Sequence, residues 1–234
     1  MDNWIDYYDS THTIYVSRRH RDLHFQVIAD DIIDYIPAPD AVVLDYACGE
    51  ALAADRVAAA CGLLILAEPA PGVRGRLIAR FAPNLRIKVR SLDDLRHLEP
   101  QSVDLAIMNS VVQYMTAAQF DTALAVAHRG LKPGGRLVLG DSPRPDVGLF
   151  TDVMALLRLA GRHGFLKDAL TGLVATALSD YRQLRSHFGL QRFSQAEMMA
   201  RLAAAGFDAT RAPANIGYNP ARMTFIATPQ HTDR

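Results

Sequence analysis

The chain has 234 residues, half of them hydrophobic and 21% charged, and a chain of this length can bury one sizeable core, alone or with a small added cap. Lys plus Arg and Asp plus Glu each total 25, so no net charge attracts it to nucleic acid or to an anionic membrane. The N-terminus lacks the basic start and apolar stretch of a secretion signal, and two cysteines, Cys48 and Cys61, suit a reducing compartment. We therefore expect a cytoplasmic protein with a small-molecule partner and with no nucleic-acid or membrane partner.

The first part of the chain alternates between apolar runs and helical patterns. One amphipathic helix is predicted from Ser17 to Ile36, because its apolar side chains recur at three- and four-residue steps until Pro37 stops the pattern. Short apolar runs then predict five strands, over residues 42–44, 63–67, 85–89, 103–108 and 136–140. Strands that alternate with helices are typical of βαβ units, so the predicted fold class is α/β with a mostly parallel sheet.

Two capping boxes place further helices. Thr116 with Gln119 opens a helix that runs to about Leu131, and the Lys-Pro-Gly-Gly sequence at 132–135 is predicted to turn the chain into the fifth strand. Ser194 with Glu197 opens a later helix that Gly206 ends, and the final two strands are predicted over 207–212 and 223–227.

The segment between strands five and six has a different pattern. Residues 146–188 carry two helical patterns with no strand between them, and they are too few to form a core of their own. We predict that they form a helical cap inserted into a single domain of residues 1–234, with residues 1–36 as an N-terminal lid segment and helix. An apolar helix of this cap could also pair with a second copy, giving a homodimer.

The most informative motif follows the first predicted strand. Asp45 ends that strand, and the turn after it, Tyr-Ala-Cys-Gly-Glu-Ala at 46–51, offers small side chains that let a ligand approach the backbone. Glu68 ends the second strand, nineteen positions beyond Gly49. A carboxylate at this spacing suits the two ribose hydroxyls of an adenosine.

Polar residues also close the later strands. In an open parallel sheet a ligand lies beyond the carboxyl ends of the strands, and the candidates there are Ser91, Asp93, Asn109, Ser110 and Asp141. Any one of them could merely cap a following helix. Together they favour a ligand site at this edge of the sheet.

The motifs in this order resemble those of the class I S-adenosylmethionine-dependent methyltransferases, over residues 40–141 and 193–228. The turn 45–51 is similar to the family's Asp-x-Gly-x-Gly-x-Gly loop, and the segments 91–95, 102–110, 131–137 and 223–227 are similar to later family segments. The resemblance implies a Rossmann-like sheet of seven strands in the order 3-2-1-4-5-7-6 with helices on both faces. It also implies methyl transfer from S-adenosylmethionine, with S-adenosylhomocysteine as product.

The resemblance assigns roles to cofactor-binding residues. Asp45 would anchor the loop and the aminoacyl end of the cofactor, Glu68 would accept the ribose hydroxyls, and Leu92 would pack on the adenine. The full set that it implies is Asp45, Ala47, Gly49, Glu68, Pro69, Ser91, Leu92, Asp93, Asn109, Ser110 and Val111.

Two departures from the family pattern bear on cofactor binding. Ala47 and Ala51 stand where the family has glycines, and we expect both to keep negative φ, because alanine is strained at positive φ. Ser91 replaces an acid beside the adenine, which predicts weaker affinity and not its loss. A dinucleotide enzyme fits less well, because pyrophosphate needs a glycine-lined loop and this one carries the acidic Glu50.

The acceptor is expected to enter over the tips of the fourth and fifth strands. Candidates for its pocket are Tyr15, Arg19, Gln113, Tyr114 and His187, and candidates for catalysis are His20, His24, Tyr114 and Asp141. His20 and His24 lie one helical turn apart, but no third ligand is apparent, so we predict no metal and expect both histidines to be surface residues more often than bases. The alternative to an enzyme is a non-catalytic cofactor-binding or scaffold module.

Overall fold

The computed structural model describes residues 4–9, 15–177 and 191–230. Its α-helices are α1 (Trp4–Asp9), α2 (Arg18–Ile33), α3 (Ala54–Ala59), α4 (Pro71–Phe81), α5 (Ala117–Gly130), α6 (Leu149–His163), α7 (Leu166–Ala177) and α9 (Gln195–Ala204). Its strands are β1 (Val42–Tyr46), β2 (Leu63–Ala67), β3 (Ile87–Arg90), β4 (Val103–Asn109), β5 (Leu131–Ser142), β6 (Phe207–Arg211) and β7 (Met223–Pro229). Two short 3₁₀ helices, η1 (Asp93–His97) and η2 (Val112–Tyr114), follow β3 and β4.

The seven strands form one sheet in the order β3-β2-β1-β4-β5-β7-β6. Neighbours from β3 to β5 are parallel, whereas β7 runs antiparallel to both β5 and β6. The strand order and the mostly parallel sheet that the resemblance implies are confirmed. Because the strand order reverses between β1 and β4, a crevice opens beyond the carboxyl ends of these two strands.

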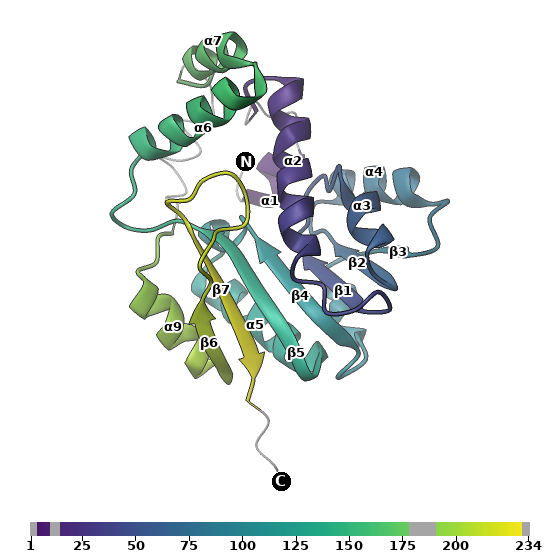
Figure 1. The fold of residues 1–234 in the computed structure, drawn as a ribbon. Helices are drawn as coiled ribbons and strands as arrows, with labels where there is room; N and C mark the ends of the chain where they lie inside the picture. The colour runs from purple at the N-terminus through teal and green to yellow at the C-terminus, as the bar shows by residue number, and fades with distance from the viewer. Residues whose placement is uncertain (1–3, 10–14, 178–190, 231–234) are drawn as a thin grey trace.

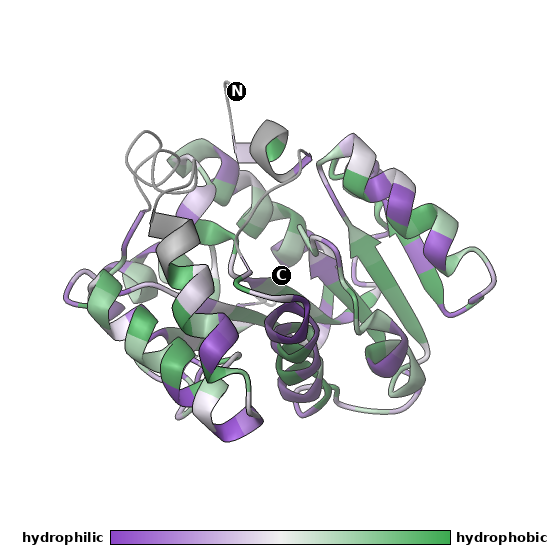
Figure 2. Ribbon diagram, turned by 90° about the horizontal axis from the view of Figure 1, so that it is seen from above, coloured by the Kyte–Doolittle hydropathy of each residue, from purple (hydrophilic) through white to green (hydrophobic). Residues whose placement is uncertain are grey.

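Helices cover both faces of this sheet, and each face has its own apolar core (Figure 1). On one face the core contains side chains of α2, α3 and α4, including Ile32, Val57 and Leu77. On the other face it contains side chains of α5 and α9, including Phe120 and Met198. Hydrophobic residues concentrate on the strands between these layers (Figure 2), as expected for a sheet buried on both faces.

The predicted helix starts are confirmed by hydrogen bonds at the caps. The Ser17 side chain accepts from the backbone N–H of His20, and Thr116 and Ser194 each form a complete capping box with Gln119 and Glu197. Each cap satisfies an N–H that the first turn of a helix leaves without an intrahelical partner. The sequence therefore fixes where these helices begin.

Two strands begin at other residues than predicted. The third strand begins at Ile87 and not at residue 85, because the Asn84 side chain holds a turn by accepting from the N–H of Arg86, and Leu85 is 91% exposed. The fifth strand begins at Leu131 and not at residue 136, so it includes the segment 132–135 that was predicted as a turn. Its register with β4 shifts between Val103 and Leu105, so the Pro-Gly-Gly residues form an irregularity inside the strand.

The two helices α6 and α7 lie beyond the same end of the sheet as the first turns of α2 (Figure 1). They form a third apolar cluster in which Leu159 and Phe165 pack with Leu23 of α2. The cap predicted for residues 146–188 contains both helices, while its residues 178–188 lie outside the described part of the chain. None of the helices described is long and apolar enough to cross a membrane.

Candidate active site

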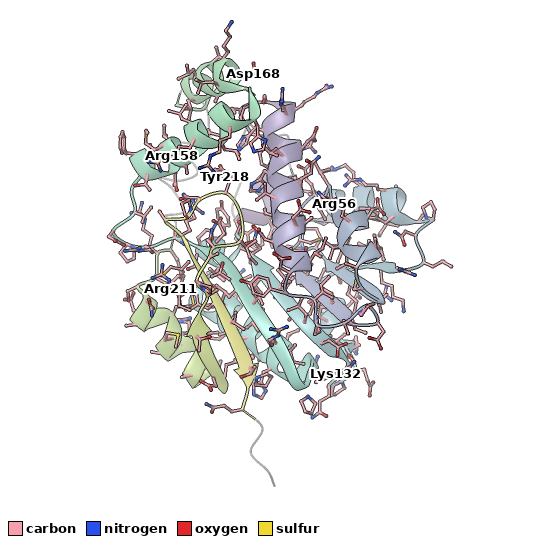
Figure 3. The ribbon with its side chains drawn as sticks, viewed as in Figure 1. Arg56, Lys132, Arg158, Asp168, Arg211 and Tyr218 are labelled. Atoms are coloured by element: carbon pink, nitrogen blue, oxygen red, sulfur yellow. The ribbon has the colours of Figure 1, made fainter. Side chains whose placement is uncertain are left out.

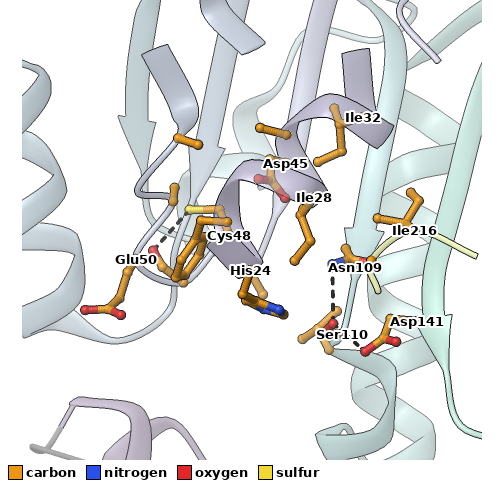
Figure 4. Close-up of a pocket in the computed structure, with 18 of the residues that line it drawn as sticks. His24, Ile28, Ile32, Asp45, Cys48, Glu50, Asn109, Ser110, Asp141 and Ile216 are labelled. Atoms are coloured by element: carbon orange, nitrogen blue, oxygen red, sulfur yellow. Dashed lines mark hydrogen bonds between the residues drawn. The ribbon is translucent and has the colours of Figure 1, made fainter. Parts of the chain in front are cut away.

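A cavity of about 330 Å³ lies beyond the carboxyl ends of the strands. Its walls come from α2, from the turn after β1, from the tips of β4 and β5, from α6 and from the loop 212–222 between β6 and β7. In Figure 4, His24 lies between the turn that carries Cys48 and Glu50 and the strand tips that carry Ser110 and Asp141. The cavity therefore spans the crevice that the strand order creates.

At one end of the cavity, two acids organise the turn after β1. Glu68 is only 3% exposed, and its two carboxylate oxygens accept from the backbone N–H groups of Gly49 and Ala70, each at 2.8 Å. Burial, and then the charge of Glu68, raise the pKa of Asp45 to about 7. A buried pair of carboxylates that share one corner is costly when both are ionised, so this corner favours a donor or a positive charge.

The backbone at the cavity edge is strained. Ala47, Ala51, Ser110 and Asp141 have φ of 56°, 42°, 56° and 56°, and all four line the cavity. The expectation of negative φ at Ala47 and Ala51 is therefore wrong. The tight turn imposes the left-handed conformation whichever residue occupies it, and alanine there costs about 1–2 kcal/mol more than glycine. Strain of this kind is concentrated at functional sites.

Glu50, the acidic residue of the turn, does not carry a free charge. Arg21 of α2 donates to both of its carboxylate oxygens, one hydrogen bond being 2.8 Å long, and Arg80 donates to its backbone carbonyl. This ion pair joins the N-terminal helix directly to the motif turn. The acidity of the turn is thus balanced from outside the cavity.

The predicted residues after β3 lie outside the cavity lining. Ser91 accepts from the N–H of Asp94 at 3.1 Å, and its own N–H donates to the Asp94 carboxylate at 2.8 Å. This reciprocal pair engages the side chains of Ser91 and Asp94 with each other's backbone at the start of η1. Leu92 packs on the core, and Pro69, Leu92 and Asp93 are absent from the lining as well.

At the other end of the cavity, an arginine bridges two acids. Arg222 donates to Asp141 at 2.8 Å and to both oxygens of Asp152 at 3.3 Å. Asp141 also accepts from Ser110 at 2.7 Å, and Asn219 donates to Asp152 at 2.7 Å. The two neighbouring carboxylates raise the pKa of Arg222, which stays charged. This network fixes the tip of β5 to α6 and to the loop before β7.

Four aromatic side chains form one wall of this end. His24 has ring centroids of Tyr15 and Tyr218 at 5.4 and 5.9 Å, and His20 has them at 5.6 and 5.8 Å. The expected surface position of His20 is wrong, since it is 4% exposed and stacks on Phe165 of the α6–α7 pair at 5.9 Å. Burial lowers the pKa of each histidine to about 4, helped by His24 at His20 and by Arg222 at His24. Both rings are therefore neutral near pH 7.

Three side-chain polar atoms in the walls have no hydrogen-bond partner among the described residues. They are Oε1 of Gln113, which is 4% exposed, Oδ1 of Asn109 and Nε2 of His20. Nδ1 of His20 accepts from the N–H of Val16, so the proton of the neutral ring belongs on Nε2. Buried groups without partners are costly, and a ligand in the cavity offers the missing partners. Tyr114, next to Gln113, stacks on Trp4 of α1 at 6.3 Å.

The structure brings most of the predicted residues to this cavity. Of the predicted acceptor set, Tyr15, Gln113 and Tyr114 line it, Arg19 is exposed and does not, and His187 lies outside the described residues. All four catalytic candidates line it, as do Asp45, Ala47, Gly49, Glu68, Asn109, Ser110 and Val111 from the cofactor set.

Sequence reasoning missed Asp152, Tyr218, Asn219 and Arg222. The last three belong to the loop 212–222, where an aromatic, an amide and a cation follow Gly217 directly before the last strand. That dense group of polar and aromatic residues in a long hairpin loop was the available signal. Within the described residues, no group of three or more His, Cys, Asp or Glu side chains could hold a metal ion.

Comparison with known proteins agrees with this architecture. Residues 43–135 match a family model described as a methyltransferase domain. A carboxy-S-adenosyl-L-methionine synthase of Shewanella sp. (strain W3-18-1) is 32% identical over 76 residues, which are 30% of this chain and 31% of that protein. The chain thus matches only about a third of that relative's length.

Solved structures share the fold over nearly the whole chain. A complex of the Haloferax volcanii Trm112 methyltransferase activator with a methyltransferase is 15% identical, with a TM-score of 0.63 over 99% of this chain and 100% of that one. The DhpI–SAH complex is 11% identical, with a TM-score of 0.61 over 97% and 96%. Residues 43–135 are therefore a methyltransferase domain, and the seven-stranded sheet has the strand order of the class I S-adenosylmethionine-dependent methyltransferases.

Proposed function

We propose that this protein transfers a methyl group from S-adenosylmethionine to a small-molecule acceptor in the cytoplasm. One observation carries the proposal. A single cavity runs from the Asp45–Glu68 corner, where the family holds its cofactor, to the chamber of Asp141, Arg222 and the aromatic wall. Cofactor and acceptor can therefore meet inside one continuous cavity.

The residues at the corner fit the cofactor. A Cβ built on Gly49 would meet nothing within 4 Å, so the backbone there is open to a ligand. Each oxygen of Glu68 already accepts one N–H and keeps a second acceptor position for a ribose hydroxyl. Asp45 would lie beside the aminoacyl end, and Asn109, Ser110 and Val111 beside the sulfonium. Residues 91–93 would meet the adenine only at the margin of the cavity.

The bound cofactor supplies a methyl group on a sulfonium, and the protein's part is to position the acceptor in line behind it. Well-oriented pairs of groups reach effective molarities on the order of 10⁵ to 10⁸ M. The walls from α2, α6 and the loop 212–222 surround this end of the cavity, and the acceptor would lie between them, over the tips of β4 and β5.

Calorimetry with S-adenosylhomocysteine tests the cofactor half of the proposal. We expect saturable binding with one site per chain. Absence of heat at millimolar ligand, with the protein folded by circular dichroism, would contradict it. Methyl transfer from radiolabelled cofactor to a panel of small acceptors tests the catalytic half.

The alternative is a scaffold that binds the cofactor and transfers nothing. The chamber with its partnerless polar atoms favours the enzyme, because a scaffold that only binds the cofactor has no use for a second end of the cavity. Turnover on any acceptor excludes the scaffold. A homodimer through the exposed apolar side chains of α6 and α7, among them Phe150 at 76% exposure, is part of the proposal, and sedimentation velocity tests it.

A further inference from the structure

The cavity extends from the polar chamber into the apolar layer between α2, α3 and the sheet. Along α2 its lining continues from His24 to Ile28, Ala29 and Ile32, which lie on one side of the helix. The eight residues from His24 to Ile32 span about 12 Å. Val57 of α3 lines the same part of the cavity. We call the space between these α2 and α3 side chains and the sheet the apolar arm.

The strand pairing shows that the sheet side of the apolar arm consists of two rows of side chains. In the first row, Asp45 of β1 lies between Leu66 of β2 and Ile107 of β4. In the second row, two residues further from the carboxyl end of β1 and on the same face, Val43 lies beside Leu64. Polarity therefore falls from the first row, which holds Asp45, to the second, whose lining side chains are aliphatic.

The apolar arm is screened from bulk solvent. Ala29, Ile32 and Val57 are 3%, 4% and 5% exposed, and they nevertheless line the cavity. Space between aliphatic side chains lowers stability, because the lining atoms lack contacts on one side. Apolar cavities stay dry and bind apolar molecules. The apolar arm is therefore suited to an aliphatic group.

The apolar arm can be reached from the acceptor side of the cavity. Ile28 lies at its near end, and a Cβ added to Gly217 of the loop 212–222 would lie 3.9 Å from Cγ1 of Ile28. Ile216 of the same loop also lines the cavity. Figure 4 shows it beside Asn109 at the tip of β4, across from Ile28. A chain attached to an acceptor over the tip of β4 can therefore enter the apolar arm between Ile28 and Ile216.

The proposed cofactor leaves the second row free. Its aminoacyl end carries an ammonium and a carboxylate, and such groups need polar partners when they are buried. Asp45 in the first row can accept from the ammonium, whereas Val43 and Leu64 in the second row offer no polar side-chain atom. The charged end of the cofactor is therefore expected to stop at Asp45.

From the aliphatic walls of the apolar arm and its opening on the acceptor side, and resting on the proposed methyl transfer, we propose that the acceptor is an amphiphile whose aliphatic chain occupies the apolar arm. Its polar head receives the methyl group in the chamber of Asp141 and the aromatic wall. Each methylene buried along the arm tightens binding about fourfold, until the chain reaches Ile32. The apolar arm thus determines which acceptors bind.

Binding of an alcohol series to the protein saturated with S-adenosylhomocysteine tests the inference without turnover. We expect affinity to rise about fourfold per methylene from 1-butanol through 1-hexanol to 1-octanol. The diol 1,8-octanediol would bury its second hydroxyl beside Val43 and Leu64, so it should bind about tenfold more weakly than 1-octanol. No rise with chain length, or equal binding of 1-octanol and the diol, would overturn the inference. Failure to bind S-adenosylhomocysteine would instead refute the proposed function beneath it.

Variants locate the effect in the apolar arm. Ala29→Phe fills the arm from α2, so it should abolish the gain in affinity beyond 1-butanol and leave S-adenosylhomocysteine binding unchanged. Ile32→Ala lengthens the arm at its far end, so the rise should continue to a longer alcohol than in the parent chain, which keeps the test available if Ala29→Phe does not fold. Ala79→Phe makes the matched change at an exposed position of α4 outside the cavity lining and should have no effect. Parent-like chain-length profiles in both arm variants would overturn the inference.

A free lipid can supply the same aliphatic chain, and a ligand with an aromatic head separates the two sources. In 4-octylphenol the chain is joined to a ring that fits the aromatic wall, so we expect it to bind about tenfold more tightly than 1-octanol. Tyr218→Leu should remove this gain and leave the affinity for 1-octanol unchanged. Equal affinities of the two ligands in the parent chain would show that one molecule does not fill both the chamber and the apolar arm. The assignment of the chain to the acceptor would then fall while the proposed function stood.

Discussion

The two ends of the sheet differ in the balance of acidic and basic side chains. At the amino ends of β1, β4 and β5, Asp104 accepts from Lys132 at 2.8 and 2.9 Å and from the N–H of Val42 at 2.8 Å, so one acid faces one base and a structural N–H. At the carboxyl ends the described residues that line the cavity include five acids and one arginine, which pairs with two of those acids. Lys132 and Tyr218 mark these two ends in Figure 3.

Backbone strain follows the same division. Of the five described non-glycine residues with positive φ, only Gln101 lies away from the cavity, and Ala47, Ala51, Ser110 and Asp141 all line it. The amino end is built for stability, while the carboxyl end holds backbone strain and closely spaced acids of the kind found at functional sites. Variants at both ends of the sheet can test this difference.

Asp45→Asn is expected to give the largest effect, on the pH dependence of stability. Since the pKa of buried Asp45 is raised to about 7, the folded state holds this proton more tightly than the unfolded state does. Its contribution is therefore present below about pH 4 and is lost as pH rises to 7. In the parent chain this costs on the order of 2–4 kcal/mol of the free energy of unfolding between pH 4 and 7, and Asp45→Asn should abolish that loss. Urea titrations at pH 4.5 and 7.5 measure it.

If stability changes with pH equally in Asp45→Asn and in the parent chain, then the pKa of Asp45 is not raised in the folded protein. The corner of Asp45 and Glu68 would then not carry the electrostatic cost that we assign to it.

His20→Phe is expected to act in the same pH window with the opposite sign. The lowered pKa of His20 means that the unfolded state binds the proton first, so stability is lost as pH falls from about 6.5 to 4. The phenylalanine ring keeps the stack on Phe165 and removes the partnerless Nε2–H. We expect the acid loss to shrink by about 2–3 kcal/mol, as judged by melting temperature against pH. A profile that stays as steep would place the acid sensitivity elsewhere.

Features set by local sequence were predicted well. Capping boxes at Thr116 and Ser194 each need only four consecutive residues. The strands β1, β2 and β4 are continuous apolar runs, which identify a buried strand without information from the rest of the chain. Strand order came from the family resemblance and is confirmed. Fold class and family could therefore be predicted from sequence alone.

Features set by distant parts of the chain could not be predicted. The burial of His20 depends on Phe165 and Tyr218, which only the folded chain brings against α2. The identity of an alanine does not indicate which φ its turn imposes, so Ala47 was expected at negative φ, whereas its φ is 56°. The roles of the cofactor and acceptor residues stay predictions, and the remaining experiments address them.

Glu68→Ala should weaken S-adenosylhomocysteine binding by about 1–3 kcal/mol. The carboxylate accepts from Gly49 and Ala70, so its loss frees the motif turn as well as removing the proposed ribose acceptor. Calorimetry measures the change, and Lys132→Met, which breaks the pair at the amino end, should leave the affinity unaltered. Equal affinities for Glu68→Ala and the parent chain would show that the cofactor does not use this corner.

The smallest expected effect comes from two variants that relieve backbone strain, only one of which lies at the cavity. Ala47→Gly and Gln101→Gly each relieve a left-handed φ worth about 1–2 kcal/mol, and the entropy of the more flexible unfolded glycine cancels about half of it. Both variants should therefore raise stability by less than about 1 kcal/mol. They differ in ligand binding, because Ala47 lines the cavity and Gln101 does not. Only Ala47→Gly, which restores the family's residue and opens the backbone to the ligand, should tighten S-adenosylhomocysteine binding. If Ala47→Gly binds it more weakly, the alanine holds the turn in its binding conformation, and strain at this end of the sheet serves preorganisation.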